Sequence, residues 1–176
     1  MPNGRDRTTD TLPSRRTILM GGAALIGATA AHSSLGAPAR AATPFEVTRS
    51  DEDWRRLLSP EQYRVLRKQG TERAGSSPLD AEKRAGAFHC AGCELPIYRS
   101  ADKFDSGTGW PSFTRPIEGA VGTSQDRSWF ATRTEIHCRR CGGHLGHVFD
   151  DGPKPTGQRY CMNGVAMTFV ADVAAK

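Results

Sequence analysis

Two short segments near residue 50 carry the apolar spacing of amphipathic helices. The first follows Ser50, an N-cap residue with three acidic residues directly after it. The second follows Ser59 with a capping box and a proline at its first helical position, and Gly70 is its predicted stop. The apolar positions of the two segments are Trp54, Leu57, Leu58, Tyr63 and Leu66. We therefore predict two brief helices at the start of the folded region.

Beyond residue 78 the pattern changes to short apolar or alternating runs, interrupted by glycine and proline. In the longest of these runs, Phe130, Thr132, Thr134 and Ile136 alternate with the residues of the opposite face. The segments 107–113 and 151–157 are predicted loops. The predicted strands are Ala87–Cys90, Pro96–Arg99, Ser128–His137, His147–Phe149, Arg159–Asn163 and Ala166–Val170. The pattern favours a mainly β fold with short N-terminal helices and two antiparallel sheets, as a sandwich or a partly open barrel.

Residues 1–41 have the pattern of a targeting signal. Arg15 and Arg16 precede a largely apolar run over 18–31, which is too short to span a bilayer comfortably, and small-residue cleavage signatures follow it. Paired arginines ahead of such a run are typical of twin-arginine export. We expect an export signal at 1–41, a linker at 42–49 and one domain at 50–176, in a periplasmic protein without stable membrane insertion after cleavage. A Sec-type signal and an uncleaved anchor are the alternatives.

The charge of the chain is concentrated in that N-terminal segment. The whole chain has a formal net charge of +5, but without residues 1–41 it keeps 19 basic and 17 acidic residues. Nor does any run of Lys and Arg alternate with aromatic residues, as in many nucleic-acid-binding grooves. We therefore expect no nucleic-acid partner.

Four of the five cysteines form two Cys-x-x-Cys pairs with 44 residues between them, Cys90 with Cys93 and Cys138 with Cys141. This spacing is typical of zinc knuckles, in which a tight turn directs two thiolates at one metal ion. Four thiolates complete a tetrahedral shell and leave no open position, so the predicted Zn²⁺ is structural, one per chain. The alternative is two disulfides and a buried spare cysteine.

The fifth cysteine, Cys161, is then left over for chemistry. On a strand, Arg159 and Asn163 share its face, where the arginine would lower the pKa of the thiol and the amide would orient a bound group. A small buried core cysteine is the alternative, since free cysteines are often buried.

Two further motifs contain residues suited to a small-molecule site. His144 and His147 lie three residues apart after the second cysteine pair, and imidazoles can protonate an oxygen that leaves a substrate. Trp110 lies among glycines and a proline, where a ring can form a rigid apolar wall. Taken singly, surface histidines and a core tryptophan are the ordinary alternatives.

Together, these motifs in this order resemble the type B methionine sulfoxide reductases, the family selective for the R epimer of the sulfoxide. The resemblance runs from Trp54 to Val170 and is carried by 63–67 (YRVLR), 70–72 (GTE), 103–113 (KFDSGTGWPSF), 144–149 (HLGHVF) and 157–163 (GQRYCMN). It implies that Cys161 attacks the sulfoxide sulfur, releases methionine and becomes a sulfenic acid. It also implies a substrate methyl group against Trp110, histidines that protonate the oxygen, and a remote structural zinc. Asn163 and Arg159 would support the pocket.

Two positions depart from that family pattern. Many members have a resolving cysteine where this chain has Thr108, so with four thiols committed to zinc we expect recycling by an external thiol, either a thioredoxin-like protein or a small thiol. Gly164 stands where serine is usual, and we expect a looser strand end. The expected substrate is oxidised methionine in proteins or as the free amino acid, and the expected state is a monomer. A zinc-held binding module, a zinc hydrolase and a thiol peroxidase are the rival functions.

Overall fold

The computed structural model describes residues 44–127 and 132–173. The predicted export signal, the first two linker residues and the positions 128–131 of the longest predicted strand lie outside these ranges. No helix in the described part of the chain has the length and apolar character needed to cross a membrane.

Two short helices begin the described domain, as the apolar spacing predicted. Helix α1 (Asp51–Leu57) is capped by Ser50, whose hydroxyl accepts from the backbone N–H of Asp53, and helix α2 (Pro60–Lys68) begins with a full capping box. Trp54 and Leu58 are buried, but Leu57 is 53 % exposed, so the predicted apolar face of α1 is narrower than expected. Gln69, with φ 53°, supplies the left-handed C-cap, one residue before the predicted glycine stop.

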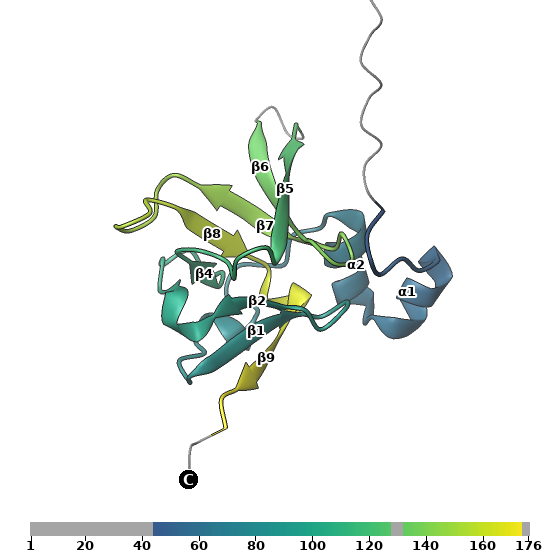
Figure 1. The fold of residues 1–176 in the computed structure, drawn as a ribbon, viewed down its shortest axis with the longest axis horizontal. Coiled ribbons are helices and arrows are strands. Elements are labelled where there is room, and N and C mark those ends of the chain that lie inside the picture. The colour runs from purple at the N-terminus through teal and green to yellow at the C-terminus, as the bar shows by residue number, and fades with distance from the viewer. Residues whose placement is uncertain (1–43, 128–131, 174–176) are drawn as a thin grey trace, which may run out of the picture. The chain divides into compact units, whose positions relative to one another are not determined.

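The strands form two antiparallel sheets, which confirms the predicted fold class (Figure 1). The smaller sheet has the order β2-β1-β9 and the larger one has the order β3-β4-β8-β7-β6-β5. The strands are β1 (Gly86–Cys90), β2 (Pro96–Arg99), β3 (Lys103–Phe104), β4 (Ser112–Phe113), β5 (Val121–Asp126), β6 (Arg133–Cys138), β7 (His144–Phe149), β8 (Arg159–Met162) and β9 (Met167–Ala171). Of the 3₁₀ turns in the described residues, η1 (Pro78–Asp80) lies between α2 and β1, η2 (Ser100–Asp102) between β2 and β3, and η3 (Gly164–Ala166) between β8 and β9.

Some strand boundaries differ from the prediction. Strand β7 begins at His144, three residues before the predicted start, because its first half pairs with β6 and is fully buried. The two-residue strands β3 and β4 lie in or beside a segment predicted as loop, and β5 carries mostly polar side chains that gave no apolar signal. These short or polar strands form through pairing with neighbours rather than through a pattern of their own.

The core lies between the two sheets and holds them together through aromatic contacts. Phe113 of β4 stacks on Tyr98 of β2 with ring centroids 4.2 Å apart, and it meets the edge of Phe88 of β1 at 5.0 Å. All three rings are fully buried, and a side chain of this size contributes about 2 kcal/mol or more through burial alone. Leu145 and Met162 extend the same core beneath β7 and β8, the strands that carry the candidate site.

Candidate active site and metal centre

The four paired cysteines meet in a single cluster. All four sulfur atoms lie within 4.8 Å of one another, with Cys90 Sγ 3.7 Å from Cys141 Sγ and Cys93 Sγ 3.5 Å from Cys138 Sγ. A tetrahedral ion with metal–sulfur bonds of about 2.3 Å places its ligands about 3.8 Å apart, close to these distances. A disulfide requires about 2.05 Å, so the alternative of two disulfides is not what the structure forms.

The two knuckles share one turn geometry. Four residues after the first cysteine of each pair, Glu94 (φ 60°) and Gly142 (φ 67°) adopt the left-handed conformation. Each then donates its backbone N–H to the carbonyl of that first cysteine, at 2.8 Å in both turns. Both turns therefore direct their thiols toward the same point, and the four cysteines could hold one metal ion in a closed shell without a position for a substrate.

A second site is a small cavity of about 140 Å³ around Cys161. Strand β8 places this cysteine between β4 and β7, opposite Ser112 on one side and His147 on the other. The sequence predicted four of the cavity residues, Trp110, His147, Cys161 and Asn163. The cavity is lined by Thr71, Trp110, Arg133, Gly146, His147, Phe149, Cys161, Met162 and Asn163. Its size suits the end of one side chain, since a site for a whole drug-sized ligand needs about 300 Å³ or more.

The Cys161 thiol is half-buried, and burial raises its pKa above the ordinary value. The guanidinium of Arg159 and the hydroxyl of Thr108 oppose this shift, so the predicted influence of the arginine has the right sign but does not prevail. One reason is that Arg159 makes two hydrogen bonds of 2.8 Å to the carboxylate of Asp151, which offsets its charge. Near neutral pH, this cysteine is therefore mainly in the thiol form.

The two histidines, predicted as a pair, occupy different environments. His147 lines the cavity, and its Nε2 lies 2.8 Å from the carboxylate of Asp126; burial lowers the pKa of His147, while this carboxylate opposes the shift. His144 is 3 % exposed, and its Nδ1 lies 2.7 Å from Glu135, whose pKa the imidazole lowers to about 2. Within the described residues, His144 Nε2 has no hydrogen-bond partner. The rings are 5.3 Å apart, so the two imidazoles are adjacent although only His147 lines the cavity.

Glu72 connects two of the cavity residues, and the sequence analysis missed this role. Its backbone carbonyl accepts from Trp110 Nε1 at 3.2 Å, and its backbone N–H donates to Asn163 Oδ1 at 2.9 Å. Its buried carboxylate accepts from the backbone N–H groups of Gly164 and Val165 at 2.6 and 2.9 Å. Asn163 also donates to the carbonyl of Leu145 at 3.0 Å, so both hydrogen-bonding ends of its amide hold the site together.

Gly164 was expected to loosen the end of a strand, but it begins the turn η3 inside the protein. A Cβ atom at this position would lie 2.1 Å from the hydroxyl oxygen of Ser77. The glycine therefore allows the segment around η1 to pack closely on η3, and its N–H is held by Glu72. Because Gly164 has no side chain, Ser77 packs directly against the backbone of this turn.

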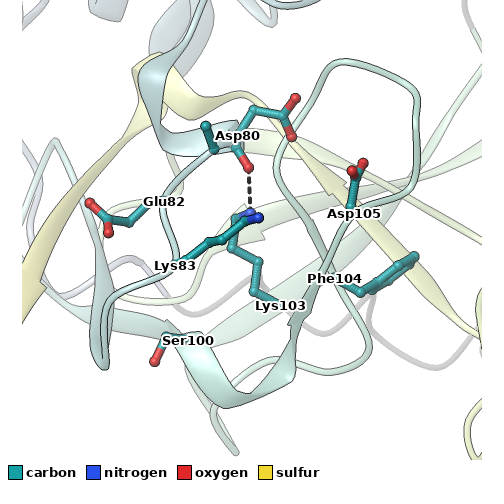
Figure 2. A pocket seen from close by; sticks show the side chains of 8 residues that line it. Asp80, Glu82, Lys83, Ser100, Lys103, Phe104 and Asp105 are labelled. Carbon is teal, nitrogen blue, oxygen red and sulfur yellow. Dashed lines mark hydrogen bonds between the residues drawn. The ribbon is translucent and has the colours of Figure 1, made fainter.

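A larger cavity of about 470 Å³ lies between η1, η2 and β3 (Figure 2). Two of its charged groups are already paired: the ammonium group of Lys103 donates to the backbone carbonyl of Asp80, and the carboxylate of Glu82 accepts from Arg84. None of the predicted site residues lines it. We therefore take the smaller cavity at Cys161 as the candidate active site.

Comparison with known proteins agrees with this geometry. A family model described as the SelR domain matches residues 58–171. Three curated relatives, each named peptide methionine sulfoxide reductase MsrB, come from Leptospira interrogans, Agrobacterium fabrum and Pseudomonas putida. They are 50 %, 51 % and 51 % identical over 71 %, 72 % and 70 % of this chain. The matches cover 96 %, 95 % and 94 % of the relatives' own lengths.

The SelR match contains both cysteine pairs and every residue that lines the cavity at Cys161. The chain therefore belongs to the SelR-domain family of MsrB peptide methionine sulfoxide reductases.

Proposed function

We propose that this enzyme reduces the R epimer of methionine sulfoxide, in oxidised proteins and as the free amino acid, with Cys161 as its nucleophile. The observation that carries the proposal is the small cavity that Cys161 shares with the indole ring of Trp110. A methylsulfinyl group has a small apolar methyl and one polar oxygen, and a cavity of about 140 Å³ suits a group of that kind.

In the proposed reaction, the Cys161 thiolate attacks the sulfur of the sulfoxide. The sulfur–oxygen bond of the substrate breaks, the oxygen passes to Cys161 as a sulfenic acid, and methionine leaves as the reduced thioether. The cysteine sulfur is oxidised by two electrons as the substrate sulfur is reduced by two. A proton is needed on the departing oxygen, because an unprotonated oxide is a poor leaving group.

The other cavity residues support this reaction by position. His147 is the proposed group beside the sulfoxide oxygen, with its ring held by Asp126. His144, held by Glu135, supports it from the buried side through the contact of the two rings. The ring of Trp110 is the proposed wall for the methyl group, and Asn163 fixes the strand end next to the nucleophile. Arg159 is the nearby positive charge that favours the thiolate.

We propose that an external thiol, from a thioredoxin-like protein or a small molecule, regenerates the enzyme. The other four cysteines lie in the metal cluster, and Thr108 stands where many family members have a resolving cysteine. One thiol from the reductant would attack the sulfenic acid and release water, leaving a mixed disulfide that a second thiol resolves.

We further propose that the ion of the four-cysteine cluster is Zn²⁺ with a structural role, and that the protein is an exported, periplasmic monomer with the domain boundaries given above. The cluster distances and the absence of an open ligand position in the described fold support zinc. The paired arginines at 15–16 support twin-arginine export, a route that moves folded proteins and would let four thiols bind zinc before they enter an oxidising compartment.

The test is turnover of separated R and S sulfoxides by purified protein with dithiothreitol, comparing wild type with Cys161→Ser. We expect R-specific turnover that the substitution abolishes, because a hydroxyl is a weak nucleophile near neutral pH. Without reductant, wild type should release about one methionine per chain and leave a dimedone-reactive Cys161. Residual turnover in the serine variant would refute the nucleophile. Faster consumption of hydrogen peroxide than of sulfoxide would favour the thiol peroxidase, and binding without turnover would favour the binding module.

A further inference from the structure

The two cysteine turns of the metal cluster share a second feature, which lies at the backbone of their last cysteine. In each turn the carbonyl of the first cysteine accepts from the turn itself. The carbonyl of the second cysteine accepts instead from an arginine that lies outside that turn, or in the other one. Cys141 accepts from Nη1 of Arg67 at 3.0 Å, and Cys93 accepts from Nη1 of Arg140 at 3.3 Å. Equivalent carbonyl groups in the two turns are therefore both held by a guanidinium group.

Arg140 joins the two turns to each other. It belongs to the second turn, and its side chain extends to the carbonyl of Cys93 in the first. Its own carbonyl accepts from the N–H of Val47 at 2.9 Å, and its Nε lies 3.6 Å from the carboxylate of Glu46. Two residues of the segment predicted as a linker thus hold the arginine that crosses between the turns.

Arg67 joins the helices to the second turn. Its guanidinium lies over the ring of Trp54, 4.8 Å from the centroid, and Trp54 is 3 % exposed. A Cβ atom at Gly92, in the first turn, would lie 3.6 Å from the same ring, which is ordinary van der Waals contact. The ring therefore lies against one turn while the arginine on its face binds the other. A cation held against an aromatic face loses little further conformational freedom when it donates a hydrogen bond.

The charge of the cluster gives these two arginines a further effect. Four thiolates and one divalent ion carry a net charge of about −2, and three of the four cysteines are buried. A buried charge is costly unless opposite charges and hydrogen bonds compensate it. Arg67 and Arg140 place positive charges at the backbone of two ligand residues. The carboxylates beside the turns, those of Glu46 and Glu94, are exposed, so solvent and salt screen their opposing charge.

We propose that Arg67 and Arg140 are positioning residues of the metal centre, which hold the two cysteine turns in place around the ion and slow its release. Each guanidinium fixes the carbonyl of one ligand cysteine, so a turn moves away from the ion only after this hydrogen bond breaks. Neither arginine lines the cavity at Cys161, so the effect on the metal is separate from the reaction. The inference rests on the proposed metal centre.

The experiment measures the rate at which zinc-loaded protein releases Zn²⁺ to an excess of the chromophoric chelator pyridylazoresorcinol, without any sulfoxide. The variants are Arg67→Met, Arg140→Met and Arg140→Lys, which keeps a cationic donor. The control is Arg55→Met. Arg55 of α1 lies over the ring of Tyr63 at 4.3 Å and binds Asp51 of the same helix at 2.8 Å, so this variant loses similar contacts away from the turns. Circular dichroism establishes that each variant is folded at the assay temperature.

We expect Arg67→Met and Arg140→Met each to release zinc about tenfold faster than wild type. This factor is the lower end of the range for a hydrogen bond to a charged group, because both arginines are partly exposed. Arg140→Lys should release zinc more slowly than Arg140→Met, and Arg55→Met should keep the wild-type rate.

Wild-type release from either methionine variant would overturn the proposal. Equal acceleration in Arg55→Met would overturn it too, because a general loss of helix stability would then explain the effect, and so would an Arg140→Lys variant as fast as Arg140→Met. If Arg67→Met does not fold, the two Arg140 variants decide the question. A wild type that takes up no Zn²⁺ would overturn both the metal centre and this inference, whereas release rates insensitive to the arginines would overturn the inference alone.

Discussion

Strands β7 and β8 approach each other closely at Gly146, so a substitution of this glycine tests whether β7 fixes the position of Cys161. A Cβ atom at this position would lie 2.1 Å from the backbone carbonyl oxygen of Cys161 and 3.0 Å from Met162 Cα. Comfortable non-bonded distances begin at about 3.5 Å, so Gly146→Ala requires the strands to separate by more than about 1 Å. No rotamer relieves this contact, because the obstacle is backbone.

We expect this substitution to affect both stability and turnover. Overpacking of this kind costs about 1–3 kcal/mol, which lowers the Tm of a domain of this size by roughly 4–15 °C. A displacement of about 1 Å at the nucleophile costs on the order of 100-fold in kcat/KM. Thermal unfolding followed by circular dichroism and steady-state reduction of R-sulfoxide measure the two effects.

Gly122→Ala in β5 is the matched control, since it makes the same change in the same sheet. There the new Cβ would meet Nε2 of His137 at 2.5 Å, the far end of a side chain that can rotate away. We expect less than about 1 kcal/mol of destabilisation and unchanged turnover, since replacing glycine by alanine also reduces the entropy of the unfolded chain. Equal behaviour of the two variants, or wild-type turnover in Gly146→Ala, would refute the claim that β7 fixes the position of Cys161.

Two further predictions concern the metal and the thiol. Elemental analysis should find about one zinc per chain. Cys93→Ser should lose the metal and unfold at a lower temperature, because metal binding and folding are coupled. A metal-free native protein that melts at the same temperature would contradict this. Because the pKa of Cys161 is raised, its thiolate is a minor species at neutral pH. The rate of Cys161 alkylation should therefore increase about tenfold per pH unit from pH 7 to 9. A plateau of the rate below pH 8 would mean a lowered pKa.

The sequence predicted most of the fold and part of the site, and the division has a physical cause. The caps at Ser50 and Ser59 depend on neighbours along the chain, so local chemistry identified both helices. The Cys-x-x-Cys pairs predicted the cluster for the same reason. Each pair forms its turn within a few residues of the chain, and two such turns supply the four ligands of one metal ion. Strands β3 and β4 have two residues each, too few to show the alternation of apolar and polar residues that is typical of strands.

What escaped prediction depends on contacts between distant segments. Glu72 contacts Asn163 and Gly164, which lie more than 90 residues later in the sequence, and no local pattern predicts such a contact. The environment of Arg159 was missed because the fold of the loop between β7 and β8, rather than a regular spacing, brings Asp151 to it. The difference between His144 and His147 follows from the carboxylate that each ring meets, Glu135 of β6 for His144 and Asp126 of β5 for His147, and the pairing of the strands places both carboxylates.

The pairing of β1 with β9 has a consequence for how the protein is made. Gly86 lies opposite Ala171 in this ladder, so the middle strand of the smaller sheet finds one neighbour only among the last residues described. While a ribosome still holds the C-terminal segment, β1 can pair with β2 alone, and Phe88 lacks the ring of Phe169 beside it. Contacts of such long sequence separation form late in folding. The smaller sheet is therefore completed only after the segment 167–171 has left the ribosome, and nascent chains halted before residue 167 would expose an unpaired edge of β1 to other chains.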